Sequence, residues 1–116
     1  MTATSPAPIV VLDAARITDW PSFHSVFAEV FGFPDFYGRN LDAWIDCMSY
    51  LDEPGAGMTQ LHRAPAHVVT LVLQNARAFA TRCPEQYRAL VECIAFVNWR
   101  FAERGEPAVL ALAFRD

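Results

Sequence analysis

Three short, continuously apolar segments lie along the chain, at residues 9–12, 67–73 and 108–114. An apolar run of this length without polar alternation is typical of a strand that is buried on both faces of a sheet. Between these segments, apolar residues recur at helical spacing. Strands that alternate with helices imply parallel pairing, so the pattern predicts an α/β fold: a three-stranded parallel sheet with about four helices packed around it.

Two helices are predicted between the first two strands. The first begins at Thr18 or Asp19, either of which is a suitable N-cap, and ends at Gly32. The second begins after Asn40, another good N-cap. Its apolar residues form one stripe and its polar residues form a second stripe on the opposite side. The apolar stripe consists of Leu41, Trp44, Ile45, Met48 and Leu51, and the polar stripe consists of Asp42, Asp46, Ser49, Tyr50 and Glu53.

Two further helices are predicted after the second strand. Asn75 can cap a short helix over residues 76–82, and a long helix runs from residue 84 to Gly105. Phe96 and Trp99 project from the side of the long helix that we expect to face away from the core. We expect another helix or a loop to cover these two rings; the alternative is a contact surface, such as that of a homodimer. The expected core stripe of this helix consists of Tyr87, Leu90, Val91, Ile94, Val97 and Phe101.

The composition fits a single domain over residues 1–116. With 53% hydrophobic and 19% charged residues, the chain is expected to fold around its own core without disulfides. It contains no apolar run long enough to cross a bilayer, and residues 1–16 lack the basic start of a secretion signal. Cys47, Cys83 and Cys93 are spaced like no known metal motif. We therefore expect a cytoplasmic protein with reduced thiols, no metal or other cofactor and no membrane association.

The negative charge of the chain is concentrated in one segment. All nine basic residues are arginines, against thirteen acids, and the formal net charge is −4. A surface with this charge attracts a basic partner and disfavours direct contact with nucleic acid. The alternative is a solvated helix face without a partner. The segment spans residues 35–53 and holds Asp35, Asp42, Asp46, Asp52 and Glu53 against Arg39 alone.

Residues 33–48 contain the most specific motif of the chain. They read Phe-Pro-Asp-Phe-Tyr-Gly-Arg-Asn-Leu-Asp-Ala-Trp-Ile-Asp-Cys-Met. This segment resembles the signature of the barstar family, intracellular inhibitors of secreted ribonucleases of the barnase type. The predicted order of strands and helices is also similar to that of the family over nearly the whole chain. The matching positions are Tyr37, Gly38, Asn40, Leu41, Asp42, Ala43, Asp46 and Cys47.

The resemblance implies an immunity protein that binds a secreted microbial ribonuclease and is not itself an enzyme. Such an inhibitor places its signature segment in the active site, where aspartates meet the basic groups that hold RNA phosphates. The spacing agrees with this role, because Asp42 and Asp46 lie four positions apart and therefore on one helix face. Two carboxylates on one face can bind arginine, lysine or protonated histidine.

Four residues before this helix complete the predicted contact surface. We expect Tyr37 to be the aromatic contact, whereas Phe36 is ambiguous. Gly38 permits either a close backbone approach or a positive φ. Arg39 either positions the loop or pairs with Asp42. The remaining motif residues, Asn40, Leu41, Trp44, Ile45 and Cys47, are assigned to the helix cap and the core.

The sequence also departs from the family pattern. Phe36 replaces a tyrosine, which removes one hydroxyl from the expected contact. An approximate alignment puts Arg100 at the position of an acid on the family's last helix, and Glu92 or Glu103 could take its place only in another register. The loop at residues 53–66 is longer as well. These differences concern the identity of the target.

Two other functions stay open. The chain could be a barstar-like binding module for a different basic partner that is not a nuclease. It could also be an enzyme that uses Asp42 and Asp46 as paired carboxylates, but a general acid and base normally need different environments within a cleft. The spacing of His24, His62 and His67 matches no catalytic triad or metal site. We expect His24 at the surface or boundary of the first helix.

Overall fold

The computed structural model describes residues 8–63 and 67–116. Residues 1–7 and 64–66 lie outside the described residues. The expectations for the segment 1–16 and for the loop 53–66 therefore fall in part outside the described residues. The elements in chain order are β1 (Ile9–Asp13), the 3-10 helix η1 (Ala14–Arg16), α1 (Trp20–Phe31), α2 (Leu41–Met48), the 3-10 helix η2 (Pro54–Ala56), β2 (Val69–Gln74), α3 (Ala76–Arg82), α4 (Pro84–Glu103) and β3 (Leu110–Arg115).

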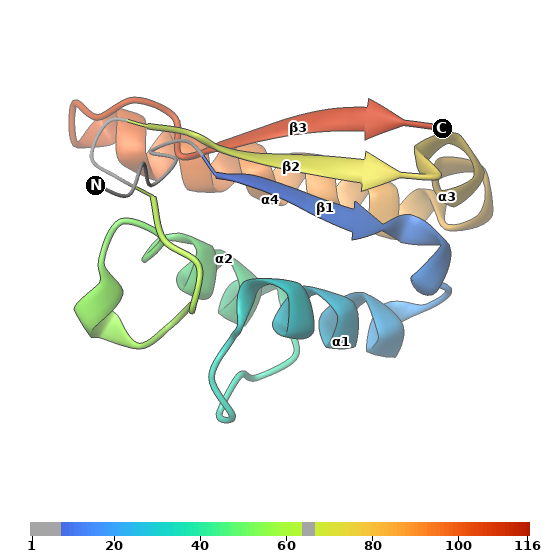
Figure 1. The fold of residues 1–116 in the computed structure, drawn as a ribbon, viewed down its shortest axis with the longest axis horizontal. Helices are drawn as coiled ribbons and strands as arrows, with labels where there is room; N and C mark the ends of the chain where they lie inside the picture. The colour runs from blue at the N-terminus through green and yellow to red at the C-terminus, as the bar shows by residue number, and fades with distance from the viewer. Residues whose placement is uncertain (1–7, 64–66) are drawn as a thin grey trace, which may run out of the picture.

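The three strands form one parallel sheet in the order β1-β2-β3, which confirms the predicted α/β fold. In Figure 1 the strands run side by side, α4 lies alongside them, α1 and α2 lie below the sheet, and α3 lies near the strand ends. The prediction that every strand is buried on both faces is wrong for β1 and for the end of β3, where Phe114 is 54% exposed. Ile9 and Val11 are exposed while Val10 and Leu12 are buried, because alternate side chains of a strand point to opposite faces.

The ends of α1 follow the predicted local chemistry. The Asp19 carboxylate accepts a hydrogen bond from the Ser22 amide at 2.9 Å, and the Ser22 hydroxyl accepts one from the Asp19 amide at 3.1 Å. This capping box fixes the first turn of the helix. Gly32 ends the helix with a φ of +69°. A Cβ at this position would lie 2.6 Å from the Gln60 side chain, so glycine is required where the later loop docks on α1.

Asn75 does not act as the predicted N-cap of α3. It precedes the helix with a φ of 56°, and its side chain makes no capping hydrogen bond. Its amide nitrogen instead donates to the Asp13 carboxylate at 2.7 Å. Because Asp13 is the last residue of β1 and Asn75 follows β2 at the same edge of the sheet, this hydrogen bond connects the ends of two neighbouring strands.

The expectation that Phe96 and Trp99 are covered is wrong. Trp99 is 61% exposed and Phe96 is 48% exposed. Val91, expected in the core, is also exposed, whereas Cys93 is buried. A 20-residue helix that packs against the sheet and α2 buries one side and presents the other to solvent. These rings therefore form an apolar part of the described surface.

The three cysteines are free and buried. Burial, assisted by the charge of Asp46, raises the pKa of the Cys47 thiol to about 11. Burial also raises the pKa of Cys93. Both thiols therefore remain protonated at neutral pH and pack as small apolar groups. Within residues 8–63 and 67–116, no His, Cys, Asp and Glu side chains are grouped to hold a metal ion, and no helix is long and apolar enough to cross a membrane.

Candidate protein-binding site

α2 positions the two aspartates of the motif. The Asn40 side chain accepts a hydrogen bond from the Ala43 amide at 2.8 Å, which confirms Asn40 as the N-cap. Asp42 lies in the first helical turn, where a carboxylate also interacts favourably with the helix dipole. Asp46 follows one turn later, and both aspartates are exposed on the same side of the helix.

The helix is shorter than the sequence pattern predicts. It ends at Met48, so Ser49, Tyr50 and Glu53 of the predicted polar stripe lie beyond it. The Ser49 hydroxyl donates to the Ile45 carbonyl at 2.7 Å, and the next backbone hydrogen bonds are those of tight turns. The acidic face of α2 itself therefore consists of Asp42 and Asp46.

The two adjacent aromatic residues before α2 point in opposite directions. Phe36 is 75% exposed, whereas Tyr37 is only 9% exposed and packs against the ring of Phe33 at a centroid distance of 4.7 Å. Burial raises the pKa of the Tyr37 phenol. The expectation that Tyr37 presents the aromatic contact is therefore contradicted, and Phe36 is the ring that a partner can reach.

His24 explains why Tyr37 is buried. The expectation that this histidine lies at the surface is wrong, because only 5% of His24 is exposed. Its Nδ1 shares a hydrogen bond of 2.6 Å with the Tyr37 hydroxyl, which satisfies both buried polar groups. Burial, with a smaller contribution from the Arg39 charge, lowers the pKa of His24, so the imidazole is neutral at pH 7. The buried pair fixes the segment before α2 onto α1.

Gly38 provides close approach and not a positive φ. The left-handed backbone conformation falls on the next residue, Arg39, whose φ is 54°. A Cβ on Gly38 would lie 3.2 Å from the Asn40 side-chain nitrogen and 3.4 Å from the Ala43 side chain. Glycine thus allows the turn to lie tightly against the beginning of α2.

Arg39 holds the same turn from the other side. Its Nη2 donates to the Pro21 carbonyl at 2.9 Å and to the Ser25 hydroxyl at 3.0 Å, both on α1. Of the two predicted roles, positioning of the loop is confirmed. The described contacts of Arg39 do not include Asp42.

A cavity of about 170 Å³ lies beside Asp46, with Phe36, Gly38 and Ala43 among its walls. Met58, from the loop after α2, also lines it, and sequence reasoning did not identify this residue. No sequence signal marks it, because its place depends on how the loop folds back. We call the surface formed by Phe36, Gly38, Asp42 and Asp46 the acidic α2 surface.

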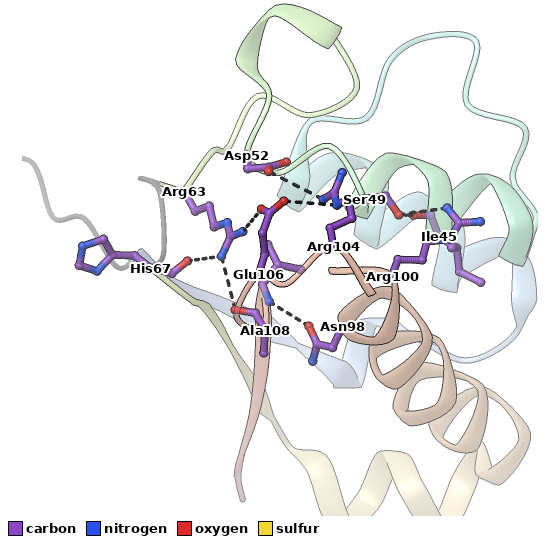
Figure 2. Close-up of polar contacts among 11 residues, drawn as sticks. Ile45, Ser49, Asp52, Arg63, His67, Asn98, Arg100, Arg104, Glu106 and Ala108 are labelled. Carbon is purple, nitrogen blue, oxygen red and sulfur yellow. Dashed lines mark hydrogen bonds and ion pairs between the residues drawn. The ribbon is translucent and has the colours of Figure 1, made fainter. Parts of the chain in front are cut away.

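Asp46 also has a basic neighbour from α4. Its Oδ1 lies 3.4 Å from the Arg100 guanidinium, which donates to the Ser49 hydroxyl at 3.2 Å as well. Figure 2 shows Arg100 directed toward Ser49. The sequence departs from the family pattern at Arg100, but it carries no signal that this side chain reaches Asp46.

The cavity beside His24 gives no support to an enzyme. It has a volume of about 370 Å³, and its walls include Trp20, His24 and Arg39 but neither Asp42 nor Asp46. The two aspartates instead share one exposed helix face, and neither this cavity nor the one at Phe36 is lined by both of them. An arrangement of this kind suits binding of basic groups better than general acid–base catalysis.

The fold and the site define an α/β protein that presents an acidic helix face and an exposed aromatic ring. The family model described as Barstar (barnase inhibitor) matches residues 7–113, and the chain belongs to this family. Members of the family are inhibitors and not enzymes. A comparison with curated proteins finds no matching sequence. Residues 33–48 alone indicate a resemblance to this family. The family model extends that resemblance to residues 7–113.

Proposed function

We propose that this protein inhibits a barnase-type ribonuclease by covering the enzyme's basic active site with the acidic α2 surface. The observation that carries the proposal is the exposure of Asp42 and Asp46 on one face of α2, beside the cavity at Phe36. Family membership supports the class of target. Inhibition results from occupying the site, and no bond is made or broken.

The chemistry of the surface matches that of a site that binds RNA phosphates. Side chains four residues apart on a helix lie about 5–6 Å apart at their Cβ atoms, so both aspartates can pair with one cluster of basic groups. Phe36 adds an exposed ring of the kind that contributes strongly at protein interfaces. Tyr37 and Arg39 act indirectly, because their hydrogen bonds to His24, Pro21 and Ser25 keep Gly38 and Phe36 in place.

We place this inhibition in the cytoplasm, where an immunity protein would protect the cell from its own ribonuclease. Three free cysteines support a reducing compartment. Fractionation of cells that express the protein at its natural level would test the location. We expect the protein in the cytoplasmic fraction, and recovery mainly from the medium would contradict this part of the proposal.

The proposal is tested by titrating the purified protein into a barnase-type ribonuclease assay. Glu29→Gln is the matched control for Asp46→Asn, because the Glu29 side chain is 63% exposed and paired with an arginine, and that of Asp46 is 59% exposed and paired likewise. We expect stoichiometric inhibition by the wild type and the control. Asp46→Asn should weaken inhibition by at least about 30-fold. This is the low end of the range of losses in affinity known for truncated charges at protein interfaces, and that range already includes the namesake pair of this family.

Two outcomes would contradict the proposal. Equal inhibition by Asp46→Asn and the wild type would exclude the acidic α2 surface as the binding site. If the folded wild type inhibits none of several barnase-type ribonucleases, the alternative from the sequence, a binding module for another basic protein, takes the place of the inhibitor.

A further inference from the structure

One basic side chain reaches into the acidic α2 surface from a different helix. The Arg100 guanidinium of α4 lies 3.4 Å from the Asp46 carboxylate and 3.2 Å from the Ser49 hydroxyl. Its guanidinium carbon lies 5.2 Å from the centre of the Phe96 ring. Three contacts of different kinds thus hold a positive charge beside a carboxylate that the proposed function assigns to the ribonuclease.

This ion pair is accessible and exchangeable. The Arg100 side chain is 43% exposed and that of Asp46 is 59% exposed, and ion pairs with this exposure contribute little to stability. A basic group from a partner can therefore replace Arg100 at Asp46. Once a basic group of the partner has replaced Arg100 at Asp46, the Arg100 charge lies at the edge of the contact. There it faces the partner residues that surround the basic site.

The shape of the surface brings a partner that binds Asp46 into contact with Arg100. A second cavity, of about 400 Å³, lies between α2 and α4 and is lined by Asp46, Ser49, Tyr50, Glu53, Arg100 and Arg104, among others. Asp46 borders both this cavity and the smaller one at Phe36. A partner that covers Asp46 consequently comes next to Arg100.

We infer that Arg100 determines specificity: it occupies Asp46 in the free protein, must be displaced on binding, and disfavours ribonucleases that are basic opposite α4. The inference rests on the proposed function. Like charges brought together at an interface oppose binding, whereas an acidic or neutral group opposite Arg100 does not. Arg100 would thereby select among ribonucleases whose active sites all bind the same phosphates.

The experiment compares Arg100→Gln and Arg100→Glu with the wild type in inhibition of a barnase-type ribonuclease. Arg16→Glu is the matched control, because Arg16 is 46% exposed, is paired with Glu29, and lies in η1 near α3 and away from α2 (Figure 1). It also changes the net charge by the same amount as Arg100→Glu. Association rates at low and moderate salt show whether the local charge or only the total charge matters.

We expect Arg100→Gln to inhibit about 3–10 times more tightly than the wild type and Arg100→Glu more tightly still, as expected when a repulsive charge leaves an interface. The association rate of Arg100→Glu should exceed that of Arg16→Glu and fall more steeply with salt. Inhibition by an Arg100 variant of a ribonuclease that the wild type leaves active would also support the inference.

The failures of the two proposals are distinguishable. If the wild type inhibits and Arg100→Glu inhibits no better than Arg16→Glu, the specificity role is overturned while the inhibitor proposal stands. Weaker inhibition by Arg100→Glu than by the wild type would mean that Arg100 contacts an acidic group directly, which also overturns displacement. If neither the wild type nor any Arg100 variant inhibits, although circular dichroism shows all of them folded, both proposals are wrong.

Discussion

Arg100 in α4 and Arg63 in the loop before β2 both pair with a carboxylate, and their surroundings differ sharply (Figure 2). Arg100 pairs with Asp46 in an exposed contact, each side chain being about half accessible. Arg63 pairs with Glu106 at 3.6 Å, and the Arg63 side chain is 1% exposed. Arg104, the C-cap of α4, pairs with the same carboxylate but is 49% exposed. The same residue types thus form an exposed, exchangeable contact around Arg100 and a cluster around a buried charge at Arg63.

The cluster around the buried Arg63 side chain connects segments that are distant in the sequence. Arg63 donates to the carbonyls of His67 and Ala108 at 3.0 and 3.4 Å, and its guanidinium carbon lies 4.9 Å from the centre of the Phe101 ring. Arg104 lies over the same ring at 4.3 Å. The cluster therefore ties the end of the long loop to α4 and to the segment before β3.

Burial, and not residue type, separates the two roles. Removing a buried charged group leaves polar partners without water or a replacement, so the loss is large and structural. An exposed pair costs little to open, so its groups are free to exchange partners. The comparison assigns stability to Arg63 and recognition to Asp46 and Arg100.

The largest expected effect is on stability. Arg63→Met should lower the free energy of unfolding by about 2–4 kcal/mol, because two partly buried carbonyls lose their donor. Arg100→Met should change it by less than about 1 kcal/mol. Urea unfolding of both variants measures the difference, and similar losses for the two would contradict the distinction.

A second pair of substitutions tests the same contrast before α2. Tyr37→Phe leaves buried His24 without its partner and should cost about 1–2 kcal/mol of stability with little change in inhibition. Phe36→Ala should leave stability within about 0.5 kcal/mol and weaken inhibition about tenfold or more. Loss of inhibition only in Tyr37→Phe would show that the aromatic contact is assigned to the wrong residue.

The buried histidine predicts a pH dependence. The folded protein keeps His24 neutral below its ordinary pKa of 6.5, whereas the unfolded chain protonates it there. The unfolded state then binds more protons, so stability falls as the pH drops below about 6.5, by at most about 1.4 kcal/mol per pH unit for one group. In His24→Gln this decline should disappear between about pH 6.5 and 5, above the range of the carboxylates. An unchanged slope would exclude His24 as its source.

The smallest effect is expected on the exposed side of α4. Trp99→Ala should change the free energy of unfolding by less than about 0.5 kcal/mol, because the ring is largely in solvent. Sedimentation of both proteins at several concentrations tests the homodimer that the sequence left open. A concentration-dependent dimer that is lost in Trp99→Ala would show that Phe96 and Trp99 form a contact between copies.

Sequence reasoning succeeded where the signal is local. The strands follow from apolar runs, and Asp19, Gly32 and Asn40 bound helices through contacts within a few residues. It failed where partners are distant. Two adjacent aromatic rings are equivalent in a sequence pattern, and only His24, thirteen positions earlier, decides that Tyr37 turns inward.

The contact of Arg100 with Asp46 spans fifty-four positions and was unpredictable for the same reason. Asn75 was assigned a capping role from its residue type, but its side chain reaches Asp13 at a strand end sixty-two positions earlier. Both contacts involve polar side chains, whose partners depend on the tertiary structure and not on the periodicity of the sequence.

The most direct test of the central claim is the binding footprint of a barnase-type ribonuclease on the isotope-labelled protein, measured by changes in backbone amide NMR signals. The account predicts that the changes centre on Phe36, Gly38, Asp42 and Asp46, with smaller changes around Arg100 and none in α3. A footprint centred on Trp99, or on the exposed residues of β1, with the α2 signals unchanged, would contradict it.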